Sequence, residues 1–451
     1  MGRGRTALVI GAGTTGLLSA AALSRHFAQV TVLERDELPT SPSWRKGSPQ
    51  SPHVHVLLKR GADIMQKYLP GALDDIERAG GHRIDMSLDT DWYYAGGWKA
   101  RLPSGITMHS QSKGLLEFTL RQHLAREPRV TVRDHAEVGA FVCENNRICG
   151  VDLVGGERIL ADLIVDAGGR NSKTSARLES AGFPRVDTSE VEVDVGYTTA
   201  LLDLPEIQRP WKSLLVHPKY PDARLGVLLP IEGTGKWLAT LVGWRGDHPP
   251  DDVDGFMAFA KSLAVPDFYT AIKDAKSVGR IWRYRFAGNL RRHFESLDPA
   301  PDGLVVVGDA ASSFNPIYAQ GMSQGATGAA LLDECLEDFR GDLRGFARVF
   351  QRRNAQFVAQ CWLMSTTEEY RDRAAFPNSP SWTRFANWYL DRVHERTWND
   401  PVVALRFLEV MHLQRSPVSL MTPGVFARVI APRSSNVEKH RGAHVAHEKT
   451  A

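Results

Sequence analysis

The sequence is poor in the features that mark several classes of protein. Its 451 residues include four cysteines, at 143, 149, 335 and 361, with neither CxxC spacing nor the density of a disulfide framework, so we expect free thiols. No apolar run reaches the ~18 residues that a membrane-spanning helix needs, which predicts no integral membrane segment. Glycines interrupt the apolar start of the chain, a pattern that does not fit a signal peptide. We therefore expect a cytoplasmic protein.

A strong excess of one charge is absent as well. The formal net charge is +3 in a chain that is 24% charged, so the composition does not indicate a nucleic-acid partner. With 43% hydrophobic residues, the chain has the composition of an ordinary soluble globular protein. Its length can bury a large core and corresponds to about two or three domains.

Residues 5 to 35 carry the clearest pattern, a predicted strand, a glycine turn, a helix and a second strand. Gly11-x-Gly13-x-x-Gly16 stands at the turn, and Glu34 stands at the end of the second strand. In this βαβ context the glycines permit a tight turn and the close approach of a pyrophosphate, whose charge the helix N-terminus favours. Glu34 can accept hydrogen bonds from both ribose hydroxyls. The predicted dinucleotide-binding residues are Gly11, Gly13, Thr14, Thr15, Gly16, Glu34 and Arg35.

Beyond this unit the pattern changes to short strands. Residues 130 to 170 are typical of a meander of hairpins broken at Asn145-Asn146 and Gly155-Gly156, and residues 190 to 245 form another β-rich block. From about residue 320 the pattern is mainly helical, and the polar residues 433–451 are predicted to be disordered. An NAD-dependent dehydrogenase would instead continue with alternating strands and helices.

The segment from 305 to 331 returns to a buried strand that ends in Gly308-Asp309. A carboxylate at the end of a distant strand favours FAD, because Asp309 could accept a hydrogen bond from the ribityl chain. Pro316 then turns the chain, and the amides near Gly321 and Met322 would point at the flavin N1–C2=O edge, which becomes anionic on reduction. Gly321 and Gly325 are four residues apart, which would remove side chains where the ring approaches, or would allow a tight helix–helix crossing.

These motifs, together with DAGGRNS (166–172) and GDAASSFNPIYAQGM (308–322), resemble those of the group A flavoprotein monooxygenases, which share the para-hydroxybenzoate hydroxylase fold. RKGSPQSPHVHVLLKRG (45–61) and NPIYAQGM are similar to the bacterial epoxidase branch, related to squalene epoxidase and the polyether-antibiotic epoxidases. The resemblance covers about residues 5 to 345. It implies an α/β fold: a Rossmann-like FAD-binding domain of the GR2 type with an inserted β-meander, a β-sheet substrate domain and C-terminal helices.

This fold implies domain boundaries. The discontinuous FAD-binding domain would comprise residues 1–85, 110–184 and 281–345. The substrate-binding β-sheet domain would comprise residues 86–109 and 185–280, and a C-terminal helical region would follow at 346–432.

The resemblance also implies roles for further residues. Arg45 would contact the flavin side of the cofactor, Arg121 would reach the pyrophosphate or ribityl region, and Val138 would pack near adenine. Lys113 stands where the family has an arginine. DAGGR departs from the DG-type motif that the family links to nicotinamide handling.

The implied chemistry is reduction of FAD by NAD(P)H, reaction with O2, and oxygen transfer from a C4a-hydroperoxyflavin to an alkene or an electron-rich ring. The sequence has no second GxGxxG in a strand–helix setting, which agrees with a nicotinamide donor that binds transiently. A separate flavin reductase as the electron source stays an open alternative. No residue is assigned as a catalytic base.

Three other functions are compatible with the same motifs. A flavin-dependent halogenase would carry a Trp-x-Trp-x-x-Pro signature, which is absent. An alkene-saturating reductase would consume no O2, and a cyclase would keep FAD without redox turnover. Anaerobic incubation with substrate distinguishes the oxygenase from the cyclase.

Candidate substrate contacts lie in three segments. Gln50, His55 and Tyr318 flank the predicted flavin site, and a short insertion carries the aromatic cluster Trp92, Tyr93, Tyr94 and Trp98, from which Trp92 and Tyr94 are selected. Such a wall would fit an apolar polyene, terpene or polyketide. His53 and His55 would share a face of a strand, but a metal site needs at least one more ligand and no partner cluster is evident, so we predict no metal. The apolar stretches 401–413 and 417–430 would allow weak membrane association, but we predict that they face the core.

Overall fold

The structure is a computed structural model that describes residues 5–45, 47–206 and 208–432; the predicted disordered tail, 433–451, lies outside the described residues. Five strands form a parallel sheet in the order β18-β12-β1-β2-β8. They are β1 (Thr6–Ile10), β2 (Gln29–Leu33), β8 (Val130–Arg133), β12 (Leu163–Asp166) and β18 (Leu304–Val306). Their Val-, Ile- and Leu-rich sequences suit a sheet that is covered on both faces.

Helices cover one face of this sheet and a small β-sheet covers the other. The helices are α1 (Thr14–Leu23), α4 (Lys113–Leu124) and α8 (Gly321–Phe339), whose buried side chains share one core with the strands. The opposite face packs against an antiparallel sheet of β9 (Val138–Glu144), β10 (Arg147–Leu153) and β11 (Arg158–Leu160). The predicted Rossmann-like core with an inserted meander is therefore confirmed. The meander is shorter than predicted, because β8 and β12 at its ends belong to the parallel sheet.

A second, eight-stranded sheet has the order β19-β17-β13-β16-β15-β14-β5-β6. Its strands are β5 (Thr90–Tyr94), β6 (Gly97–Trp98), β13 (Thr188–Asp203), β14 (Ser213–Val216), β15 (Leu225–Pro230), β16 (Lys236–Trp244), β17 (Ser277–Arg292) and β19 (Ser312–Ser313). Strand β17 stays in this sheet up to Arg292, past the boundary predicted at residue 280. Helices α6 (Val253–Lys261) and α7 (Asp267–Ile272) pack on one face of the sheet.

Smaller elements connect the two sheets. A three-stranded sheet contains β3 (Val56–Leu57), β7 (Thr107–Ser110) and β4 (His82–Asp85), and α2 (Lys59–Tyr68) and α3 (Ala72–Arg78) follow β3. Helix α5 (Thr174–Ser180) follows β12. Between β18 and α8 lie the short 3₁₀ turns η2 (Gly308–Ala310) and η3 (Pro316–Tyr318); η1 (Phe294–Ser296) precedes β18.

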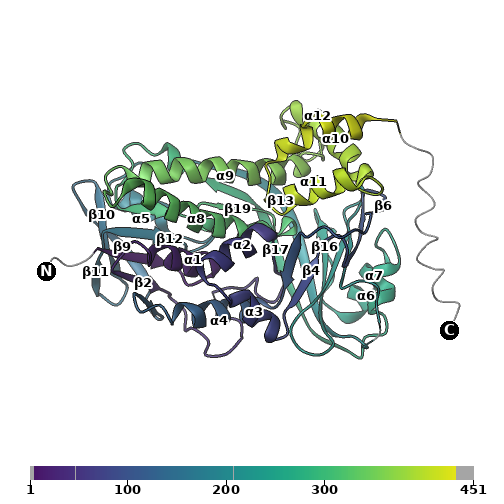
Figure 1. Cartoon of the computed structure of the whole chain (residues 1–451), viewed down its shortest axis with the longest axis horizontal. Helices are drawn as coiled ribbons and strands as arrows, with labels where there is room; N and C mark the ends of the chain where they lie inside the picture. The colour runs from purple at the N-terminus through teal and green to yellow at the C-terminus, as the bar shows by residue number, and fades with distance from the viewer. Residues whose placement is uncertain (1–4, 46, 207, 433–451) are drawn as a thin grey trace.

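The C-terminal helices join the two halves of the molecule. Helix α9 (Phe346–Glu369) runs beside α8 toward α10 (Trp382–Arg396), α11 (Pro401–Met411) and α12 (Pro423–Ile430), as Figure 1 shows; the turn η4 (Pro417–Met421) precedes α12. Asp400 caps α11 by accepting from the amides of Val402 and Val403, and Pro401 occupies the first turn, where its missing N–H is not needed. Phe407 and Val425 are buried in one core with Trp92, so each of the two apolar stretches packs one side against the interior, while Val402 and Val418 are exposed. Among the described helices, none is both long and apolar enough to cross a membrane.

Candidate functional site

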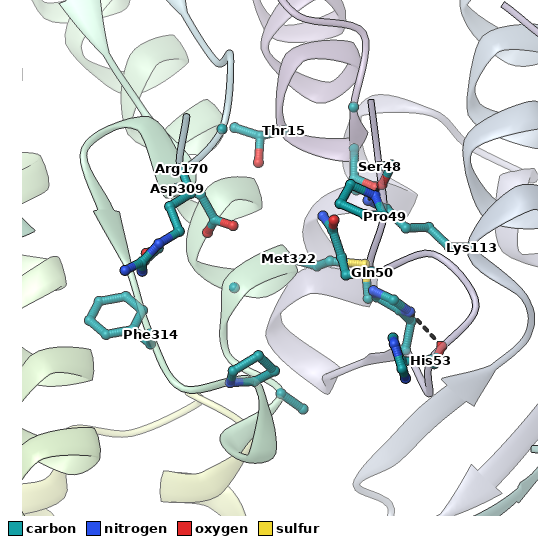
Figure 2. A pocket seen from close by; sticks show the side chains of 18 of the residues that line it. Thr15, Ser48, Pro49, Gln50, His53, Lys113, Arg170, Asp309, Phe314 and Met322 are labelled. Atoms are coloured by element: carbon teal, nitrogen blue, oxygen red, sulfur yellow. Dashed lines mark hydrogen bonds between the residues drawn. The ribbon is translucent and has the colours of Figure 1, made fainter. Parts of the chain in front are cut away.

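A cavity of about 610 Å³ lies between the parallel sheet and the eight-stranded sheet. Its lining includes Gly11 and Glu34 of the first βαβ unit and also Trp92 and Leu229 of the large sheet. Figure 2 shows Asp309 and Thr15 on one side of the space, and Ser48, Pro49 and Lys113 on the opposite side. Cavities of about 300–1,000 Å³ are typical of sites for small molecules and cofactors.

The glycines of the first turn occupy different positions around the cavity. Gly11 has a φ of +96°, and a Cβ there would lie 2.7 Å from the carbonyl oxygen of Ala167, so the turn requires glycine. A Cβ on Gly16 would lie 1.9 Å from the carbonyl oxygen of Gly11, which fixes Gly16 as a packing position outside the cavity lining. Gly13, Thr14 and Thr15 line the cavity.

Glu34 lines the cavity, and one of its two carboxylate oxygens accepts two short hydrogen bonds from the protein. Its Oε2 accepts from the amide of Ala12 at 2.8 Å and from Arg45 Nη1 at 2.6 Å. Its Oε1 accepts only a longer bond, 3.2 Å, from the amide of Asp36 among the described residues. Since a carboxylate has about four acceptor positions, Glu34 can still accept from a ribose hydroxyl.

Arg45 lies at the glycine loop, whereas the family resemblance implied a contact at the flavin side. A Cβ on Gly13 would lie 3.4 Å from Arg45 Nη2. The reason is acidic surroundings: besides Glu34, Arg45 Nε donates to Glu117 Oε2 at 3.2 Å. Burial alone lowers the pKa of the Arg45 guanidinium, but Glu117, Glu34 and Asp36 outweigh it and raise that pKa above its usual value.

Other predicted nucleotide contacts have mixed positions. Val138, Arg35 and Lys113 line the cavity. Lys113 Nζ donates to Ser48 Oγ at 2.8 Å and lies 3.4 Å from Glu117 Oε1. Arg121 is not among the lining residues; its Nη2 donates to the carbonyl oxygen of Pro39 at 2.7 Å, because the side chain extends along the loop after β2 instead of into the cavity.

Asp309 presents an open acceptor to the cavity. Its carboxylate forms no hydrogen bond with any residue in the described part of the chain, and Figure 2 shows it turned toward the open space. Burial raises the pKa of this carboxyl, while Lys113 and Arg170 act in the opposite direction. Pro316, Gly321 and Met322 also line the cavity, so the start of α8, with its unpaired first amides, faces the same space.

Two other glycines of this segment serve packing. A Cβ on Gly308 would lie 2.9 Å from Thr15 Oγ1, and a Cβ on Gly325 would lie 1.9 Å from the same atom. The missing side chains let α8 approach α1 closely. Gly325 therefore belongs to the helix–helix crossing, and neither Gly308 nor Gly325 lines the cavity.

Of the predicted substrate contacts, Gln50, His55, Trp92 and Tyr318 line the cavity and Tyr94 does not. Tyr94 stacks behind Trp92, with ring centroids 6.1 Å apart, and lies 4.1 Å from the ring of His394. Tyr93 and Trp98 pack in the core on the other face of the sheet, as strand alternation requires.

His53 and His55 do not lie on a strand, because β3 begins only at Val56. The intervening segment turns, so that His55 Nδ1 hydrogen-bonds to the carbonyl oxygen of His53 at 2.7 Å, the bond dashed in Figure 2. His53 Nδ1 lies 2.7 Å from Thr199 Oγ1, and both histidines line the cavity.

Several lining residues were missed by the sequence analysis. They come from alternate positions of three neighbouring strands: Leu215 of β14, Leu225, Val227 and Leu229 of β15, and Thr240 and Val242 of β16. The period-two alternation was the available signal, but it does not say which face of the sheet meets the cavity. Met411 and His412, far along the chain, had no local signal.

The residues around the cavity fit FAD. The glycine loop and Glu34 lie at one end of the lining, and Asp309 and the start of α8 lie at another part of the same cavity. A model of the family described as FAD binding domain matches residues 5–339. The chain belongs to this family. FAD is accordingly its cofactor.

The relatives agree with this assignment. Protein Rv3254 of Mycobacterium tuberculosis is 29% identical over 94% of this chain and 93% of its own length. Kynurenine 3-monooxygenase of Salinispora tropica is 25% identical over 73% of this chain and 72% of its own. The crystal structure of PqsL, a probable FAD-dependent monooxygenase from Pseudomonas aeruginosa, has a TM-score of 0.62 at 17% identity, covering 83% of this chain and 98% of PqsL, which shows a shared fold. The protein is an enzyme of the flavin-dependent monooxygenase class.

Proposed function

We propose that the enzyme uses NAD(P)H and O2 to transfer one oxygen atom to an uncharged, apolar substrate, by epoxidation or hydroxylation. Bound FAD would supply the reduction and oxygen chemistry, while the protein orients the substrate and excludes water. Glu34, the glycine loop, Asp309 and the start of α8 would hold the cofactor. The proposal retains the epoxidase-branch resemblance of residues 45–61.

The observation that carries the proposal is the chemistry of the cavity wall formed by the large sheet. On four neighbouring strands of this sheet, β5, β14, β15 and β16, the lining residues are Trp92, Leu215, Leu225, Val227, Leu229, Thr240 and Val242, none of them charged. The strands β13 and β17 add Tyr197, Tyr284, Phe286 and Arg285, and the Arg285 guanidinium is paired with Asp194 at 2.8 Å. A charged substrate would have to leave its hydration shell against these four strands without an ionic partner there, which is costly.

The histidines of the cavity do not change this conclusion. Burial lowers the pKa of His53 to about 4 and that of His55, His217 and His412 to about 3 in each case, burial being the largest cause. All four are therefore neutral imidazoles at pH 7 and provide hydrogen bonds without a positive charge. A neutral terpene, polyene or polyketide fits this lining.

The test starts with the purified protein and its flavin absorbance spectrum. NADH or NADPH oxidation and O2 uptake are then followed with a panel of polyenes and phenols, and products are analysed by mass spectrometry under ¹⁸O2. A product that gains one ¹⁸O atom, and that does not form anaerobically, supports the proposal. Product formation while the flavin stays oxidised would favour the cyclase, and alkene saturation without O2 uptake would favour the reductase.

The electron donor is tested in the same assay. Direct oxidation of NADH or NADPH by the purified protein supports a transient nicotinamide site. Turnover that requires an added flavin reductase would assign electron supply to a separate protein.

A further inference from the structure

A buried polar cluster connects the end of α9 with the cavity. Glu369, the last residue of α9, is 6% exposed. Its Oε1 accepts from Asn315 Nδ2 at 2.7 Å and from the Tyr318 hydroxyl at 3.3 Å. The Tyr197 hydroxyl donates to Asn315 Oδ1 at 2.6 Å. Tyr318 and Tyr197 both line the cavity, so Glu369 lies one side chain behind its wall.

The charges around Glu369 leave its carboxyl without a directly bonded cation in the described structure. The adjacent Glu368 is paired with Arg371, whose Nε lies 2.6 Å from Glu368 Oε2, and Asp372 is paired with Arg245. Burial raises the pKa of Glu369 to about 7, reinforced by the Glu368 charge and opposed by the hydrogen bonds from Asn315 and Tyr318 and by Arg245.

The other titratable groups of the cluster keep one protonation state near neutral pH. Burial raises the pKa of Tyr197 and of Tyr318 well above 10, so both stay hydroxyl donors. On α10, His394 lies 4.0 Å from Glu368, and burial lowers its pKa to about 4, so it stays neutral. Burial opposes the charge on Glu368, but Arg371 and His394 lower the pKa of its carboxyl below the usual range. Glu369 is the member of this cluster that titrates near pH 7.

The proposed reaction needs a proton inside the cavity. Substrate, O2, NAD(P)H and one proton give oxygenated substrate, NAD(P)⁺ and water, so each turnover consumes one proton from solvent. A cavity that excludes water must receive this proton through side chains.

We propose that Glu369 stores this proton and that the Tyr318 hydroxyl passes it into the cavity. When Glu369 is protonated its O–H donates to Tyr318, the reverse of the bond in the structure, and the Tyr318 hydroxyl turns toward the cavity. In the transfer the Tyr318 O–H bond breaks as its proton moves to an anionic atom in the cavity. The Glu369 O–H proton moves to the Tyr318 oxygen, and Glu369 is left as a carboxylate, which solvent then reprotonates. Asn315 holds the carboxyl in place. The inference rests on the proposed function, because the anionic atom arises from that chemistry.

Two substitutions test the proton store. Glu369→Gln keeps an acceptor oxygen for Asn315 and Tyr318 but cannot titrate, and Tyr318→Phe removes only the hydroxyl. Glu337→Gln, on the exposed side of α8, and Tyr389→Phe, whose hydroxyl donates to the Leu420 carbonyl, are the matched controls.

The first measurement needs neither cofactor nor substrate. Infrared titration of the apoprotein from pH 5 to 9 should show a carboxylic acid that ionises near pH 7 in the wild type and in both controls. This signal should be missing in Glu369→Gln. A titration identical in Glu369→Gln and the wild type would overturn the proposal.

The second measurement is the pH profile of coupled turnover. In the wild type the rate should fall as pH rises through about 7, because the store empties. Glu369→Gln and Tyr318→Phe should lower kcat by on the order of 10²-fold with little change in KM, and their profiles should lose this limb. If Glu369→Gln has the same pH profile of turnover as the wild type, Glu369 has only a structural role and the proposed storage of a proton is rejected.

The failure of the proposed function gives a different result. If no oxygenated product forms with any protein, the function is rejected while the infrared titration still decides whether Glu369 titrates. If product forms and all pH profiles coincide, the function stands and the proton store is rejected.

Discussion

Asp309→Asn should weaken FAD binding without weakening the apoprotein. The substitution keeps the size of the side chain and removes the charge at the open acceptor that faces the cavity. A hydrogen bond to a charged group is worth about 1.5–3 kcal/mol. At 1.4 kcal/mol per factor of ten, the Kd for FAD should rise about 10- to 150-fold.

The apoprotein should respond in the opposite direction. Because burial raises the pKa of Asp309 in the folded state, the folded protein binds this proton more tightly than the unfolded chain does. Stability from this group is therefore present below the unfolded pKa, about 3.9, and is lost as pH rises through the folded pKa. Asp309→Asn has no such loss, so its Tm relative to wild type should increase between pH 3 and pH 7.

The assay is a titration of apoprotein with FAD, followed by flavin fluorescence, alongside thermal unfolding of the apoprotein. Asp338→Asn, on the exposed face of α8, is the control and should bind FAD as the wild type does. An unchanged Kd for FAD in Asp309→Asn would refute the assignment of this carboxylate to the cofactor. A lower Tm of apo Asp309→Asn at pH 7 would refute the assigned unfavourable burial.

Two further predictions concern stability. Gly325→Ala places a methyl group 1.9 Å from Thr15 Oγ1 and should lower the free energy of unfolding by about 1–3 kcal/mol, measured by urea titration. The control Gly424→Ala has open space around the new Cβ and should not lower it. Equal effects of the two substitutions would contradict the tight crossing of α1 and α8. Arg45→Met removes the buried guanidinium that pairs with both Glu34 and Glu117, and leaves Glu117 with Lys113 alone among the described residues. It should lower the free energy of unfolding by about 3–5 kcal/mol at pH 7, against little change for the exposed Arg348→Met. Burial opposes the charge on Glu117, but Lys113 and Arg45 lower the pKa of its carboxyl below the usual value, so this stability is present above the unfolded pKa and lost as pH falls. The difference between Arg45→Met and the wild type should therefore shrink at acid pH, and a difference that does not depend on pH would contradict the ionic account.

The sequence was most informative where one short segment contains all the residues of a predicted binding element. Gly11, Gly13 and Gly16 carry their spacing and context within a single βαβ unit, and the structure has Gly11 in a tight turn and Gly16 packed against it. Asp309 and Gly321, which both line the cavity, were predicted for the same reason, since a strand end and a helix start follow each other along the chain.

Long-range contacts were beyond this kind of reasoning. Arg45 forms an ion pair with Glu117, a residue on helix α4, and a side chain on Gly325 would collide with Thr15 of α1. Tyr94 was chosen with Trp92 from one aromatic cluster, but only Trp92 lines the cavity, since Tyr94 packs against His394 of α10. Glu369 gave no signal at all, because its meaning depends on Tyr318, a residue distant in sequence.

The central claim is that the glycine loop and the segment from Asp309 to Met322 bind one FAD molecule together. A crystal structure of the purified protein with FAD tests it most directly. We predict the adenosine ribose against Glu34 and the isoalloxazine ring beside residues 316–322. A ring located elsewhere, with this cavity filled only by solvent, would contradict the claim.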